Sequence, residues 1–300
     1  MRWILLLPAF ALIGLLAGQE PATAPATPVE KEKESDEVDF ICPMDPEVRT
    51  KGPGKCPRCG MRLVAGIADL VEYPVSLRLS PRLPRAGKPV DLTFHVEDPK
   101  TGAAVKKFEV VHEKLFHLFL VSEDLRHFSH EHPQLDPSGA FRFRWTFPQP
   151  GPYRVLTDFY PAGGTPQMHA STLFIAGQAP RRIALKPDVA PQKGANLEVE
   201  LITEPPQPLA GFKTLMFFRL KPAAGDLKLE SYLGAWGHML AASEDLIDLV
   251  HNHPFLADGG PQVQFNMIFP REAIYRVWVQ FQNAGEVNTV AFNVPVKQLR

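Results

Sequence analysis

The stretch HLFLVSEDLRHFSHEHP, residues 117–133, returns later in the chain as HMLAASEDLIDLVHNHP, residues 238–254. Eight of the seventeen positions are identical: the first His, Ser-Glu-Asp-Leu and the final His-x-His-Pro. A second pair, FPQPGPYRV from Phe147 and FPREAIYRV from Phe269, repeats at almost the same distance, 122 residues against 121. This steady offset predicts two copies of one domain, each of about 110 residues.

The sequence of each copy predicts β-structure. In FRFRWTF, residues 141–147, aromatic residues alternate with Arg and Thr, and VQFNMIF, residues 263–269, alternates in the same way. Period-two alternation is typical of half-buried strands, and 31 prolines and 21 glycines favour short strands joined by turns. We expect a mainly β protein with two tandem immunoglobulin-like antiparallel β-sandwiches at 70–177 and 190–297.

The N-terminus predicts export. Arg2 precedes an apolar run, Ile4 to Leu16, which is too short to span a bilayer and suits a signal peptide over residues 1–18. Residues 19–38, rich in Pro, Ala, Thr and charge, form a predicted flexible linker. The chain is therefore expected to be periplasmic or secreted and not an integral membrane protein, with an uncleaved membrane anchor as the alternative.

All three cysteines lie in FICPMDPEVRTKGPGKCPRCGMRL, residues 40–63. Cys42 and Asp45 form one potential knuckle, and Cys56 and Cys59 form a second. Gly60 permits the positive φ that such a turn often needs, and Pro53-Gly54 forms a turn that returns the chain. The segment 39–66 is thus predicted to be a small two-knuckle metal-binding module with these four ligands.

Several alternatives remain open for this module. A Cys56–Cys59 disulfide would leave Cys42 free, and a zinc ion could serve folding alone. A carboxylate at Asp45 favours Zn²⁺, whereas Cu⁺ prefers three thiolates with a soft thioether from Met44 or Met61. Both methionines can instead simply pack the small core.

The motif CPMDPEV…PGKCPRCGMRL resembles the short heavy-metal-binding domain of copper-exporting P-type ATPases and of periplasmic adaptor subunits of metal efflux pumps. The resemblance covers about 25 residues and implies that Cys42, Cys56 and Cys59 are metal ligands. The family pattern has histidine where this chain has Asp45. The histidine-containing stretch also resembles a group of secreted bacterial proteins that often carry the heavy-metal-binding segment, which implies metal handling without a defined reaction.

The repeated pattern H-x12-H-x-H predicts two further metal sites, His117, His130 and His132 in the first copy and His238, His251 and His253 in the second. A hairpin with Ser122 opposite Leu125 would place His117 opposite His130 on the neighbouring strand. The equivalent hairpin in the second copy would place His238 opposite His251. Three imidazoles on one face suit Zn²⁺, Cu²⁺ or Ni²⁺. Alternatively, the histidines hydrogen-bond the repeated Ser-Glu-Asp-Leu loop. The first copy is favoured by additional nearby donors: His112, His127, Met168 and His169.

These features predict an exported heavy-metal-binding protein that sequesters or hands over a transition metal, Zn²⁺ or Cu⁺/Cu²⁺. A metal efflux protein or metallochaperone is the expected partner. The alternative is an interaction protein whose zinc knuckle only stabilises the small module and whose sandwiches bind a protein. We expect no enzymatic activity, because no nucleophile elbow, phosphate loop or HExxH motif occurs. The net charge of −1, without a basic cluster, argues against nucleic acid.

Overall fold

The computed structural model describes residues 40–45, 48–65, 71–182 and 184–300. The predicted signal peptide and linker, residues 1–38, lie outside this range. Within the described residues all regular structure is β, which confirms the predicted mainly β class. No helix of the described part is both long and apolar enough to cross a membrane.

The cysteine module has one small sheet in the order β2-β1-β3. Its strands are β1 (Phe40–Ile41), β2 (Arg49–Thr50) and β3 (Val64–Ala65). The Cys42 amide donates to the carbonyl of Val48, and the Cys56 amide donates to that of Met61. Gly60 has a φ of +74°, as the sequence predicts for the second knuckle. Backbone bonds therefore hold each cysteine in a tight turn.

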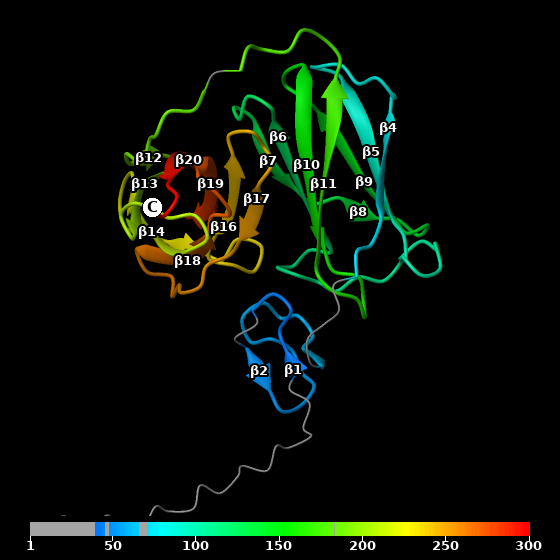
Figure 1. The fold of residues 1–300 in the computed structure, drawn as a ribbon, viewed down its shortest axis with the longest axis horizontal. Coiled ribbons are helices and arrows are strands. Elements are labelled where there is room, and N and C mark those ends of the chain that lie inside the picture. Colours follow the sequence, from blue (N-terminus) through cyan, green and yellow to red (C-terminus); the bar gives the residue numbers. More distant parts are fainter. Residues whose placement is uncertain (1–39, 46–47, 66–70, 183) are drawn as a thin grey trace, which may run out of the picture. The chain divides into compact units, whose positions relative to one another are not determined.

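The first sandwich has sheets in the orders β4-β5-β9-β8 and β11-β10-β6-β7. Figure 1 shows these strands in cyan and green. Their bounds are β4 Val75–Ser80, β5 Pro89–Val96, β6 Phe116–Ser122, β7 Phe128–Glu131, β8 Gln134–Leu135, β9 Ala140–Thr146, β10 Gly151–Phe159 and β11 Gln167–Ile175.

The second sandwich repeats this plan, with sheets β12-β13-β14-β18 and β15-β19-β16-β17, and with β20 paired to β19. Its strands are β12 Gln192–Lys193, β13 Leu197–Glu204, β14 Lys213–Pro222, β15 Leu229–Glu230, β16 His238–Ser243, β17 Leu249–Asn252, β18 Gln262–Ile268, β19 Ala273–Asn283 and β20 Glu286–Val296. The order β11-β10-β6-β7 thus corresponds to β20-β19-β16-β17, as duplication predicts.

The alternating strands behave as the sequence predicts. In β9 the side chain of Phe141 is fully buried, whereas Arg142 and Arg144 are exposed. In β18, Val263 and Phe265 are fully buried in the core of the second sandwich. The two sandwiches have separate apolar cores, because each is enclosed by its own pair of sheets.

Strands β6 and β16 differ from the others because both of their faces are buried. In β6, Leu118 and Leu120 pack in the first core, while Phe119 and Val121 point the opposite way. The second set joins residues of the other repeat in one apolar cluster. The buried members of this cluster are Phe119, Val121, Leu125, Leu156, Leu240, Ala242, Leu246, Leu249 and Trp278. The outer faces of two corresponding sheets therefore form a shared apolar interface.

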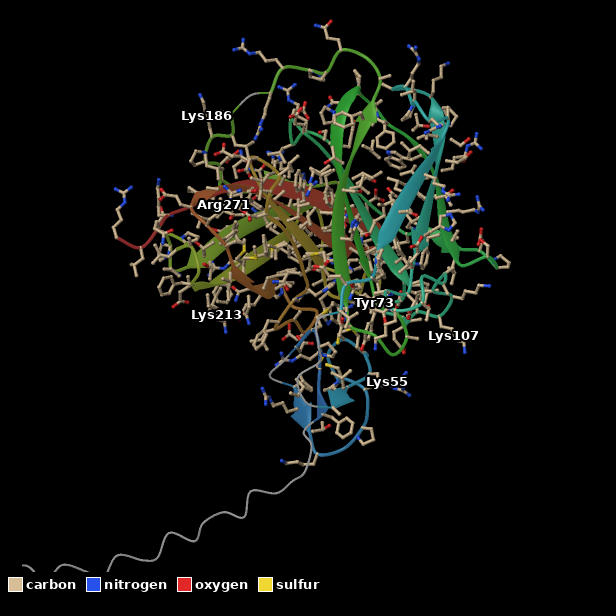
Figure 2. The ribbon with its side chains drawn as sticks, turned by 45° about the vertical axis from the view of Figure 1, so that its right-hand side comes forward. Lys55, Tyr73, Lys107, Lys186, Lys213 and Arg271 are labelled. Carbon is tan, nitrogen blue, oxygen red and sulfur yellow. The ribbon has the colours of Figure 1, made fainter. Side chains whose placement is uncertain are left out.

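The repeated Ser-Glu-Asp-Leu loop is closed by its own side chains. Ser122 Oγ donates to Asp124 Oδ1 at 2.6 Å, and Ser243 Oγ donates to Asp245 Oδ1 at 2.7 Å. Arg271, labelled in Figure 2, donates to Asp245 Oδ1 at 2.5 Å. These bonds explain why the tetrapeptide is repeated without any contribution from a histidine side chain.

The predicted hairpin register is wrong by two residues. Phe119 pairs with His130, and Leu240 pairs with His251, whereas the sequence argument placed His117 and His238 opposite those histidines. The cause is a longer loop: the Ser122 amide donates to the carbonyl of His127, so these two residues pair, while the Leu125 amide donates to the carbonyl of Ser122 and closes a turn inside the loop. A shift of two residues keeps every side chain on its face, so the histidines still share one side.

The apolar interface is expected to contribute to stability as strongly as a domain core. Leu240→Ala removes a side chain that is 1% exposed and should lower the free energy of unfolding by about 2–5 kcal/mol. Leu83→Ala, at a position 79% exposed, is the matched control and should change it by less than about 0.5 kcal/mol. Urea unfolding measures the free energy of unfolding of both variants. Equal changes in the two variants would contradict a packed interface.

Candidate metal centres

The four predicted ligands of the cysteine module converge. Ligand atoms of Cys42, Asp45, Cys56 and Cys59 all lie within 4.8 Å of one another. Cys42 Sγ is 3.5 Å from Cys59 Sγ, and Cys56 Sγ is 3.6 Å from Asp45 Oδ2. Thiolates bound about 2.3 Å from a tetrahedral ion lie about 3.8 Å apart, so these spacings suit one ion. All three cysteines are free thiols.

The module holds Cys42 ready to act as a thiolate. The pKa of Cys42 is lowered to about 6, because a hydrogen bond from the Cys59 thiol and one from the Asp45 amide, 3.2 Å from the sulfur, together outweigh the opposing effect of burial. The same interaction with Cys42 raises the pKa of Cys59. One thiolate is thus available at neutral pH before metal arrives.

Both methionines of the module contribute to its core. Met61 is 1% exposed in a cluster with Cys42, Cys56, Val111 and Tyr160, and Met44 packs against that cluster. This agrees with the packing role that the sequence left open. Such a small segment has little apolar area, so a bound ion would add to its stability.

The first histidine triad also converges. His117 Nδ1 lies 3.1 Å from His130 Nε2 and 3.3 Å from His132 Nε2. Nitrogen ligands about 2.0–2.1 Å from a tetrahedral zinc ion are separated by about 3.3–3.4 Å. The three nitrogens therefore already have the spacing of a metal site.

The second triad uses the equivalent atoms. Ligand nitrogens of His238, His251 and His253 lie within 4.8 Å of one another. His238 Nδ1, His251 Nε2 and His253 Nε2 are buried and have no hydrogen-bond partner among the described residues. Burying an unpaired polar atom is costly, so three unpaired nitrogens together point to a ligand.

Hydrogen bonds on the outer side of the rings set the tautomers. His117 Nε2 lies 3.1 Å from the carbonyl of Val111, and His238 Nε2 lies 2.9 Å from that of Tyr232. A carbonyl only accepts, so each Nε2 carries the hydrogen and the inward Nδ1 of the neutral ring has a free lone pair.

The second histidine of each triad is bonded across the repeat interface. His130 Nδ1 lies 2.9 Å from Gln280 Oε1, and His251 Nδ1 lies 2.6 Å from Asp158 Oδ2. Both partners accept, so in the neutral form of each ring the inward Nε2 also has a free lone pair. In the first triad, two such lone pairs then face each other across 3.1 Å, an arrangement that a cation would stabilise.

Burial favours the neutral form of five of the six triad imidazoles. It lowers the pKa of His117 to about 4 and that of His132 to about 3, and it holds the pKa of His130, His238 and His253 well below the usual value. Metal ions bind the neutral imidazole, so no proton has to leave these rings at pH 7.

The sequence argument missed Asp158 and Gln280. They pair with His117 and His238 at equivalent positions of β10 and β19, and they match in the aligned stretches YRVLTDF and YRVWVQF. A polar residue at the same aligned position of both stretches was the available signal. Only the packing of the two sheets shows which histidine each one contacts.

Of the additional donors expected in the first copy, His112 contacts the second triad instead of the first. Its ring stacks on that of His253 with centroids 3.7 Å apart, and its Nε2 is buried and unpartnered. His127 and His169 do not belong to any cluster of His, Cys, Asp and Glu ligand atoms in the described residues, and the side chain of Met168 is 52% exposed.

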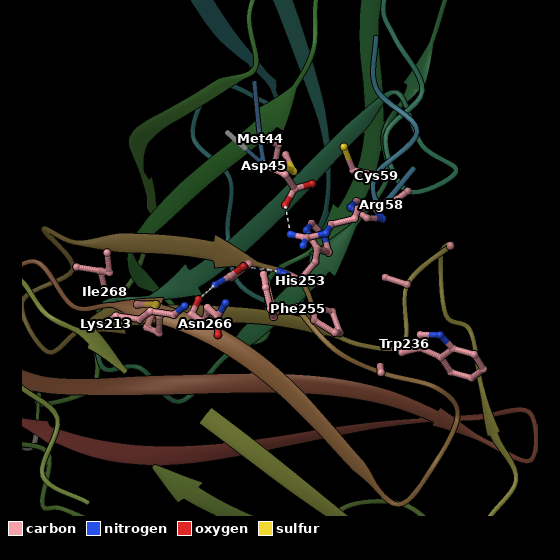
Figure 3. A pocket seen from close by; sticks show the side chains of 17 residues that line it. Met44, Asp45, Arg58, Cys59, Lys213, Trp236, His253, Phe255, Asn266 and Ile268 are labelled. Carbon is pink, nitrogen blue, oxygen red and sulfur yellow. Dashed lines mark hydrogen bonds and ion pairs between the residues drawn. The ribbon is translucent and has the colours of Figure 1, made fainter. Parts of the chain in front are cut away.

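A pocket lies between the cysteine ligands and the second triad. Met44, Asp45, Arg58 and Cys59 line it together with His112 and His253. Figure 3 shows Asp45 and Cys59 on one side of this pocket and His253 on the other, with Arg58 Nη1 3.9 Å from Asp45 Oδ1.

Comparison with family models matches residues 69–175 and 193–298 to one domain family, described as "Domain of unknown function (DUF8832)". These matches cover most of the chain, so the protein belongs to this family as two tandem copies. Residues 40–65 match the family "Heavy metal binding domain". The protein therefore combines a heavy-metal-binding segment with a duplicated β-domain.

No curated protein matches the chain. Among solved structures, the Escherichia coli adhesin FdeC is similar at 14% identity over 78% of this chain and 69% of that one, with a TM-score of 0.27. The Yersinia pseudotuberculosis adhesin InvE has 9% identity, coverage of 74% and 60%, and a TM-score of 0.24. The chicken CNTN1 FN1–FN3 domains have 8% identity, coverage of 81% and 76%, and a TM-score of 0.22.

The buried histidines predict that acid destabilises the metal-free chain. An unfolded imidazole titrates near pH 6.5, whereas folded His117 has a pKa of about 4. Between these values the unfolded state binds more protons, so the free energy of unfolding should fall as the pH drops from about 6.5 to 4. Urea unfolding of chelator-treated protein at several pH values measures this. A constant free energy across that window would contradict the burial.

Proposed function

We propose that this protein is an exported heavy-metal-binding protein that sequesters transition metal ions or hands them over. The convergence of three imidazole nitrogens in each triad is the observation that carries the proposal. In the first triad His117 Nδ1 lies 3.1 and 3.3 Å from the other two nitrogens, and in the second triad the three nitrogens are buried without a hydrogen-bond partner among the described residues. The heavy-metal-binding segment and its cluster of three thiols and one carboxylate support the same conclusion.

The proposed ligands form three sites. Cys42, Asp45, Cys56 and Cys59 form the first. The second consists of His117, His130 and His132, and the third of His238, His251 and His253. Asp45 favours Zn²⁺ at the cysteine site, while three thiolates would also hold Cu⁺. Imidazole triads accept Zn²⁺ or Cu²⁺.

The proposed location is the periplasm or the exterior, reached through the N-terminal apolar segment. There the chain would receive ions from, or deliver them to, a metal efflux protein or metallochaperone. The pocket that places Cys59 and His253 on opposite walls supports a role that includes transfer as well as storage. The proposed role is binding and delivery, without a chemical reaction.

The cysteine site is tested by Cys56→Ser in the full chain. Cobalt binding to the wild type should produce thiolate-to-metal charge-transfer absorption, because Co²⁺ occupies tetrahedral zinc sites and bonds to sulfur. The variant should lose most of this absorption and one equivalent of bound ion. Undiminished absorption would exclude Cys56 as a ligand.

The histidine sites are tested by His130→Ala, with His95→Ala as a control at a histidine on β5 outside both triads. Metal analysis after reducing purification and loading should give three ions for the wild type and the control. The His130 variant should bind two. If the wild type binds only one ion, at the cysteines, the sandwiches do not bind metal, which would favour the alternative function of partner recognition.

A further inference from the structure

The two histidine triads form one cluster across the interface between the repeats. His130 lies 5.3 Å from His238 and 5.9 Å from His251, measured between ring centroids. His117 lies 5.7 Å from His251. These separations are close to those within a triad, such as the 5.4 Å between His117 and His130. Ions bound to the two triads would therefore lie near each other and repel in a buried, weakly screening environment.

The triads are nearly identical in their ligand atoms but unequal in their supporting groups. At equivalent positions, Asp158 accepts from His251 and Gln280 accepts from His130. The assignment of Gln280 is consistent, because its amide nitrogen donates to Thr289 Oγ1 at 3.0 Å. A carboxylate behind a ligating imidazole makes that ring a stronger donor and offsets the charge of the ion, whereas a neutral amide only orients the ring.

We propose that Asp158, a residue of the first repeat, makes the triad of the second repeat the tighter of two coupled metal sites, so that this triad fills first. The first triad, supported by Gln280, fills second and more weakly. This reverses the expectation from sequence that the first copy binds preferentially. The inference rests on the proposed function, because it requires both triads to bind metal.

The mechanism gives Asp158 a positioning role. Its carboxylate does not belong to the ligand group but holds Nδ1–H of His251, so that Nε2 points at the ion. Because Asp158 and His251 come from different repeats, an ion at the second triad also secures contact between the repeats. Gln280 of the second repeat accepts the equivalent hydrogen bond from His130 of the first repeat, but its amide is uncharged.

The experiment isolates each triad in the full chain. His132→Ala removes a ligand of the first triad and leaves the second, and His253→Ala does the reverse. Cobalt affinity is measured by competition with a chelator, and the ligand-field bands that lack thiolate charge transfer report the histidine sites. The second triad, isolated by His132→Ala, should bind more tightly than the first, isolated by His253→Ala.

Asp158→Asn is then added to His132→Ala. Asparagine keeps the shape and the accepting oxygen but removes the charge, so affinity at the second triad should fall about 10–100-fold. Gln280→Glu, added to His253→Ala, should raise affinity at the first triad, as expected for a charge effect but not for a purely structural one. Asp226→Asn, a change of the same type at an exposed loop position, is the control and should leave both affinities unchanged.

Circular dichroism and unfolding midpoints establish that each variant is folded, and the Gln280→Glu arm does not depend on the stability of the Asp158 variant. The proposal is overturned if Asp158→Asn changes the second-triad affinity less than threefold, or if the first triad is the tighter site. If neither isolated triad binds cobalt, the histidine part of the proposed function fails as well, which is a separate result.

Discussion

The arrangement of this protein depends on two sheets that each have two buried faces. β6 and β16 pack one face in their own sandwich and the other against the opposite repeat. His117 and His238 lie on the second face, so they are removed from water along with Phe119 and Leu240. In such surroundings a polar ring needs a partner for each nitrogen. The outward nitrogens of His117 and His238 have carbonyl acceptors, whereas the inward nitrogens of the second triad have no hydrogen-bond partner among the described residues.

Duplication explains both the likeness of the triads and their difference. The two repeats share the positions of the histidines, the loops that follow them and the carbonyls that accept from His117 and His238. Packing the copies face to face lets one residue of each repeat reach a histidine of the other. Because Asp158 and Gln280 occupy equivalent positions but differ in charge, the two triads have the same arrangement and unequal supporting residues.

The cysteine module contrasts with the histidine triads in the softness of its donors. Its sulfur atoms are held by backbone turns and a very small core, whereas the imidazoles are held by long strands and a large apolar interface. Soft thiolates and harder imidazoles suit different ions or oxidation states. Donors of both kinds, among them Cys59 and His253, line one pocket.

Sequence periodicity and the internal repeat were sufficient for the β class and the duplication, because local alternation is written along the chain. Residue type and spacing also singled out the ten residues that the structure gathers into three clusters, and their role as ligands stays a prediction. These sequence patterns were not sufficient for the hairpin register, since the loop after Ser122 is longer than a minimal turn. Nor did they indicate that the triads meet, that His112 approaches His253, or that Asp158 supports His251. Those contacts join residues up to 150 positions apart, and only the packing of one sheet on another brings them together.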